Sequence, residues 1–93
     1  MDNKIKQINN VLNKFFSNPS NPRAVRAKDL MELFIAHGIF EKDNKNGLPI
    51  RDLLRKLDRK NKLHLIPFVH PERKSKNTYW YFIKIDSDKI RIA

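Results

Sequence analysis

The chain contains no cysteine and only two glycines among its 93 residues. Without cysteine it can form no disulfide framework, no thiolate metal site and no cysteine nucleophile. The three histidines, His37, His64 and His70, are not spaced as a cluster of metal ligands, so we expect no metal and no cofactor. The glycines, Gly38 and Gly47, form no glycine-rich phosphate loop, and we identify no nucleophile paired with a general base. These absences argue against an enzyme.

Long apolar segments are also missing. The longest apolar runs span only a few residues, too short to cross a membrane. The first ten residues, MDNKIKQINN, lack the apolar core of a secretory signal. A hydrophobic content of 40% with 10% aromatics favours a folded chain over a disordered one. We therefore expect one soluble cytoplasmic domain over 1–93, with its core over about 5–85 and a tail over 86–93.

Acidic residues are scarce beside basic ones. Ten Asp and Glu stand against 20 Lys and Arg, which gives a formal net charge of +10. Over half of this excess lies in residues 48–76, where nine basic side chains face only Asp52, Asp58 and Glu72, a net charge of +6. A concentrated positive footprint favours a polyanionic partner. The alternative is a lysine-rich surface that is merely solvated.

The apolar spacing predicts three helices. The first covers residues 5–16 and ends at two prolines; the second covers about 28–37 and ends at Gly38. Val25 is placed in a very short strand before the second helix. The third helix runs over about 48–61, with a proline tolerated in its first turn. Its apolar stripe is the clearest in the chain and consists of Ile50, Leu53, Leu54 and Leu57.

The sequence after the third helix predicts an antiparallel hairpin. Strands are expected over 62–71 and 78–85, joined by a polar basic loop over 72–77. Pro67 has no backbone donor, so the first strand should be a sheet edge there or carry a bulge. The tail over 86–93 is a candidate for a short third strand.

Alternation divides the second strand of this hairpin into two faces. One face carries Tyr79, Tyr81, Ile83 and Ile85, and the other carries Trp80, Phe82 and Lys84. Because Ile83 and Ile85 continue the tyrosine face, we expect this face to pack against the helices. Trp80 and Phe82 then need cover from the first helix, the tail, a second subunit or nucleic-acid bases. We favour cover from within the chain, with a homodimer as the next alternative.

The order of helix, short strand, two helices, strand, basic loop and strand resembles the winged helix-turn-helix superfamily. The stretch GLPIRDLLRKLDRKNKLHLIPFVHPERKSKNTYWYFI carries the resemblance most clearly. It implies an α+β fold of three helices followed by an antiparallel hairpin, the wing. It also implies that the third helix enters the DNA major groove while the wing contacts the backbone or minor groove. The connection over 38–48 is longer than the tight turn usual between the last two helices.

By position, the resemblance implies a set of nucleic-acid-binding residues on the third helix and on the wing. Arginine can pair bidentately with guanine in the major groove, whereas lysine serves phosphates as a point charge. The helix residues are Arg51, Arg55, Lys56, Arg59 and Lys62, and the wing residues are Arg73, Lys74 and Lys76.

The resulting hypothesis is a non-enzymatic module that binds double-stranded DNA, in transcription regulation or in the machinery of a mobile element. One alternative is a protein-interaction module of the same fold, which docks a partner or a second copy through the hydrophobic face of the hairpin. The other is a basic RNA-binding protein, for which the sequence shows no dedicated motif.

Overall fold

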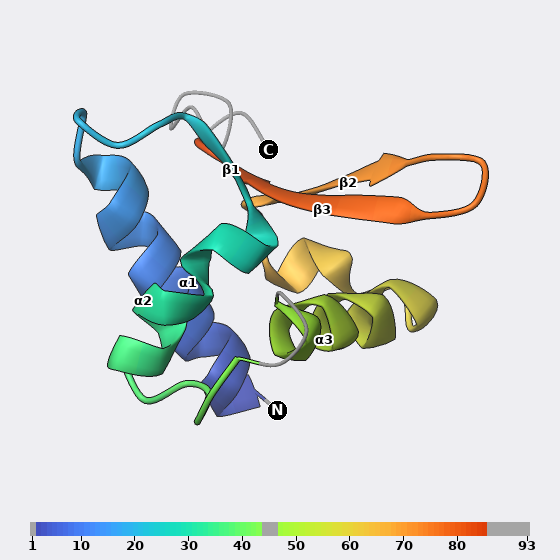
Figure 1. The fold of residues 1–93 in the computed structure, drawn as a ribbon, viewed down its shortest axis with the longest axis horizontal. Helices are drawn as coiled ribbons and strands as arrows, with labels where there is room; N and C mark the ends of the chain where they lie inside the picture. The colour runs from blue at the N-terminus through green and yellow to red at the C-terminus, as the bar shows by residue number, and fades with distance from the viewer. Residues whose placement is uncertain (1, 44–46, 86–93) are drawn as a thin grey trace.

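A computed structural model describes residues 2–43 and 47–85. Within these residues the fold is α+β and winged-helix-like, with three α-helices on one side of a three-stranded antiparallel sheet (Figure 1). In chain order the elements are α1 (Asp2–Ser17), β1 (Ala24–Arg26), the 3-10 helix η1 (Ala27–Leu30), α2 (Met31–Ala36), α3 (Leu48–Arg59), the 3-10 helix η2 (Leu63–Leu65), β2 (Val69–Arg73) and β3 (Thr78–Ile83).

The first helix is confirmed, although it begins at Asp2, three residues before its predicted start. Its apolar residues at helical spacing form one face that is buried in the core. The helix ends at Ser17, and prolines at 19 and 22 prevent its continuation. The side-chain amide of Asn21 donates to the carbonyl oxygen of Phe15 at 2.8 Å, which satisfies one of the open carbonyls at the helix end.

The short strand predicted at Val25 is confirmed as β1, and the second helix lies close to its predicted range. Its first turn is the 3-10 helix η1, so the regular helix α2 begins only at Met31. Gly38 ends the helix as predicted, with a φ of 74°. The backbone N–H of Ile39 donates to the carbonyl oxygen of Phe34 at 2.9 Å, a bond that closes the last turn and turns Ile39 into the core.

The start of α3 is fixed by a close approach to η1. Gly47 precedes the helix with a φ of 88°, a conformation that favours glycine. A Cβ atom at this position would lie 2.5 Å from the Cβ of Lys28, so a larger residue could not stand there without a shift of the backbone. The contact holds the first turn of α3 against the segment that carries Lys28.

The end of α3 comes two residues before the predicted end at 61. Asn61 adopts a left-handed conformation with a φ of 57°. The backbone N–H of Lys62 then donates to the carbonyl oxygen of Leu57 at 2.7 Å, which closes the helix.

The strand predicted over 62–71 is wrong over residues 62–68. Turn hydrogen bonds continue after α3 and form η2, so β2 begins only at Val69. Pro67 therefore lies before the strand and causes neither an edge nor a bulge. Pro71 does lie within β2, and this strand is at the edge of the sheet, where a missing donor is tolerated.

The sheet has the order β1-β3-β2, so β3 is its central strand. The partners of β3 differ in length. Strand β2 pairs with residues 78–82, whereas β1 pairs only with residues 81–83. Within the described ranges, residues 78–80 consequently have a neighbouring strand on one side only.

The prediction for the two faces of β3 is wrong. Trp80 and Phe82, which are 6% and 0% exposed, face the helices, while Tyr79 is 50% exposed. Residues two apart on a strand are separated by about 7 Å, so the two aromatic rings reach different parts of the core. The ring of Phe82 packs edge-on against that of Phe34 in α2 at 6.0 Å between centroids. The expected cover from within the chain is confirmed.

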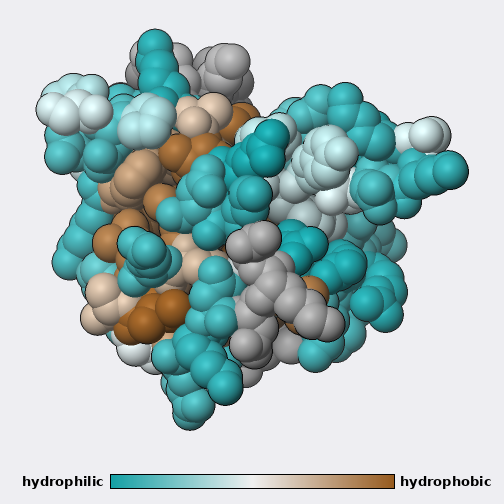
Figure 2. Space-filling view, viewed as in Figure 1, coloured by the Kyte–Doolittle hydropathy of each residue, from teal (hydrophilic) through white to brown (hydrophobic). Residues whose placement is uncertain are grey.

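The strand predicted over 78–85 ends at Ile83, and the third strand expected in the tail lies outside the described residues. No helix in the described part of the chain is long and apolar enough to cross a membrane. In the view of Figure 2, apolar residues gather over the side of α1, α2 and β1, and hydrophilic residues cover the side of α3 and the hairpin.

Candidate nucleic-acid interface

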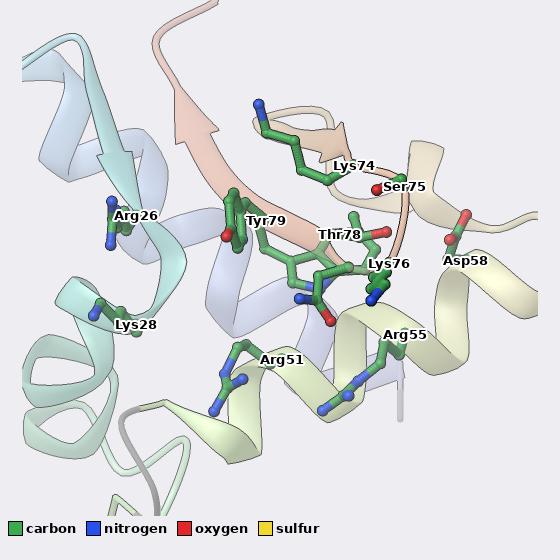
Figure 3. Close-up of a pocket in the computed structure, with 12 residues that line it drawn as sticks. Arg26, Lys28, Arg51, Arg55, Asp58, Lys74, Ser75, Lys76, Thr78 and Tyr79 are labelled. Atoms are coloured by element: carbon green, nitrogen blue, oxygen red, sulfur yellow. The ribbon is translucent and has the colours of Figure 1, made fainter.

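A groove of about 700 Å³ lies between α3, the junction of β1 with η1, and the loop of the hairpin (Figure 3). Six of its twelve lining residues are basic and one is acidic. We call it the basic groove. Its basic residues are Arg26, Lys28, Arg51, Arg55, Lys74 and Lys76, and the others are Asp58, Ser75, Asn77, Thr78, Tyr79 and Trp80.

Three segments that are distant in the sequence bring these charges together. The apolar stripe of α3 is buried, which leaves Arg51 and Arg55 on the flank of the helix that borders the groove. Lys28 is held beside the first turn of α3 by its contact with Gly47. Lys74 and Lys76 come from the loop between β2 and β3. The groove is therefore a product of tertiary packing.

An ion pair links the hairpin to α3. The two guanidinium nitrogens Nη1 and Nη2 of Arg73 donate to the two carboxylate oxygens of Asp58 at 3.0 and 2.9 Å. The hydrogen bonds from Arg73, and its charge, hold the pKa of the Asp58 carboxyl below its usual value of 3.8. The pair neutralises the one acidic side chain in the groove. Arg73 was predicted in the wing loop but is the last residue of β2.

Two further ion pairs lie at the rim of the groove. Arg55 Nη2 lies 2.7 Å from Asp52 Oδ1, and Lys74 Nζ lies 2.8 Å from Glu72 Oε1. Hydrogen bonding to Lys74 lowers the pKa of Glu72 and raises that of Lys74. All four side chains are exposed to solvent, and such pairs contribute little to stability. An incoming phosphate can therefore replace these carboxylates at small cost.

Three other groove cations have no partner of opposite charge in the described part of the chain. Arg26, Lys28 and Lys76 are exposed and form no ion pair with any residue in the described ranges. Sequence reasoning missed Arg26 and Lys28, because basic and acidic residues nearly balance over 23–47. The sequence feature that could have identified them is their closeness to a third basic residue, Arg23.

The predicted site residues divide between two surfaces. Four of them, Arg51, Arg55, Lys74 and Lys76, line the basic groove, and Arg73 pairs with Asp58. The other three lie outside the groove lining and are exposed. We call these three, Lys56, Arg59 and Lys62, the outer basic surface.

The groove presents guanidinium, ammonium, hydroxyl and amide groups, a set of donors that suits phosphates and base edges. Within 2–43 and 47–85, no three histidine or acidic side chains are grouped closely enough to hold a metal ion. His37 contacts the carbonyl oxygen of Leu33 at 2.9 Å at the end of α2 and lies outside the groove lining. No protein-family model, curated protein or solved structure matches the chain.

Proposed function

We propose that the chain is a non-enzymatic module that binds double-stranded DNA through the basic groove and the adjacent outer basic surface. The observation that carries this proposal is the convergence of six basic side chains from three segments on one groove. Neutralising the phosphate backbone supplies much of the affinity of such proteins and is independent of sequence. A concave basic surface lets several phosphates be contacted at once.

In this proposal, the helix and the loop have different roles. Helix α3 has twelve residues, and the major groove of B-DNA, about 12 Å wide, admits an α-helix. Arg55 and Arg59 are exposed on α3 and can reach base edges. Lys74, Lys76 and Lys28 are then the phosphate contacts, because an ammonium group serves phosphate as a point charge.

B-form DNA suits this arrangement better than duplex RNA, because the major groove of A-form RNA is too deep and narrow for side chains to read. Docking of a protein partner has less support. Its basis in the sequence was an exposed aromatic face at Trp80 and Phe82, and both residues are buried within the chain.

The test is fluorescence anisotropy with a random duplex over a series of salt concentrations. If each of the six groove cations neutralises one phosphate, log K should fall against log salt with a slope of about −5. Single-stranded DNA and structured RNA of equal length serve as controls and should bind more weakly at each salt concentration. A flat salt response, or no binding at low salt, would contradict the proposal.

A further inference from the structure

Tyr79 is an exposed aromatic side chain within a basic groove. It is 50% exposed, and it lines the groove between Arg26 and Lys28 on one side and the hairpin loop on the other (Figure 3). Its neighbour Trp80 points the opposite way and is buried, so the strand beneath Tyr79 is anchored in the core. Leu65 is the other exposed large hydrophobic residue in the described ranges and lies outside the groove lining.

The groove also carries hydrogen-bonding groups beside Tyr79. Among the described residues, 78–80 have a pairing strand on one side only, since β1 pairs no further than Tyr81. Backbone groups on the other side of this short edge are therefore open toward the groove. The side chains of Ser75, Asn77 and Thr78 add hydroxyl and amide groups to the same lining. In a base pair, the Watson–Crick edges of both bases are already hydrogen-bonded to each other. An unpaired base presents a free Watson–Crick edge, which can bind these donors and acceptors.

Together these features match the way in which proteins hold unpaired nucleotides, with a basic groove along the backbone and an aromatic ring under a base. The volume of about 700 Å³ lies within the range of about 300–1,000 Å³ that is usual for sites enclosing a small organic group. A peptide strand is a poorer occupant, because the open edge of β3 spans only residues 78–80.

We propose that the basic groove holds an unpaired nucleotide at the end of a duplex, with its base stacked on Tyr79 and its flanking phosphates beside Lys28 and Lys76. The preferred ligand is then a duplex that carries a single-stranded extension. This inference rests on the proposed function, because the duplex part of the ligand is held as described above.

The experiment compares a blunt duplex with the same duplex carrying a four-nucleotide single-stranded extension, at the 3′ end in one probe and at the 5′ end in another. Anisotropy at fixed salt should show at least one of the extended probes binding about 5- to 150-fold more tightly, the range expected for one base stacked on an aromatic side chain. Tyr79→Ala should abolish this preference, so that the blunt and the extended duplexes bind this variant with equal affinity.

Three further variants separate stacking from loss of structure. Tyr79→Phe keeps the aromatic ring and should keep the preference, whereas Tyr79→Leu fills similar space without a ring and should lose it. Leu65→Ala removes the matched exposed side chain outside the groove and should change nothing. Thermal melting by circular dichroism checks that each variant is folded.

The outcomes distinguish this inference from the function on which it rests. Equal affinity of the wild type for blunt and extended duplexes, or an undiminished preference in both folded Tyr79→Ala and Tyr79→Leu, overturns the inference and leaves duplex binding intact. Absence of salt-dependent binding to every probe overturns both.

Discussion

The basic groove and the outer basic surface both carry exposed cations, but they are built differently. The outer surface needs only α3 and the turn after it, because Lys56, Arg59 and Lys62 follow one another along the chain. The groove needs the packing of Gly47 on Lys28 and the ion pair between Asp58 and Arg73. The presence of exposed cations alone therefore does not distinguish one surface from the other. The groove holds its charges in a fixed concave arrangement, while the outer surface adds positive charge beside it.

The core lies directly beneath the groove, and Trp80 shows this most clearly. It is 6% exposed and belongs both to the core and to the groove lining. Replacing it with Ala should lower the free energy of unfolding by about 3–5 kcal/mol, because a large buried ring is removed. This is a substantial part of the roughly 5–15 kcal/mol that stabilises a small domain.

Thermal or urea unfolding measures this loss, with Tyr79→Ala as the adjacent control on the opposite face of β3. The control should cost less than about 1 kcal/mol, the scale of a cross-strand pair contact. Equal melting temperatures for Trp80→Ala and the wild type would show that the core does not support the groove in this way.

Charge removal compares the two surfaces directly. The double variant Lys28→Gln with Lys76→Gln should lower the affinity for duplex DNA at least about tenfold and make the salt slope shallower by about 2, one unit for each phosphate that is no longer neutralised. The matched double variant Lys56→Gln with Lys62→Gln removes the same charge from the outer basic surface and should lose less affinity. Equal losses in the two double variants would mean that net charge, rather than the groove, governs binding.

The smallest expected effect concerns the ion pair that links the hairpin to α3. Because Arg73 lowers the pKa of Asp58 from 3.8, the pair stabilises the fold fully above pH 3.8, and this contribution is lost as pH falls through the lower pKa of the folded state. The difference in melting temperature between the wild type and Asp58→Asn should therefore be constant at neutral pH and shrink in acid. The pKa of Glu72 is also lowered, by its hydrogen bond to Lys74, but Glu72 is present in both proteins and its effect cancels in the comparison. A difference that persists unchanged at pH 2 would contradict this assignment.

The sequence predicted the order of elements because its signals there are local. The apolar stripe of α3, the prolines after α1 and the glycine after α2 each act within a few residues of their own position. The largest boundary error lies at the turn after α3. There Lys62 bonds back to Leu57 and leads the chain into η2, although the residues alternate as a strand would.

The groove residues that the sequence did not reveal are brought together by contacts between distant segments, and no local pattern contains such contacts. Alternation divides β3 into two faces, but whether Trp80 or Tyr79 faces the helices depends on how the sheet packs on them. Likewise, Lys28 joins the groove through Gly47, nineteen residues later in the chain. The pairing of Arg73 with Asp58 also spans fifteen residues, so charge counting could not separate a structural arginine from a binding one.

Mapping of the contact surface by NMR tests the central claim most directly. Backbone amide shifts of the labelled protein would be followed during titration with a short duplex. The largest changes should fall in three separate segments that meet only at the basic groove, namely residues 26–28, 51–55 and 74–79. Smaller changes are expected at Lys56 and Lys62 of the outer basic surface. Changes concentrated on α1 and α2, with the three groove segments unaffected, would contradict the assignment of this groove as the interface.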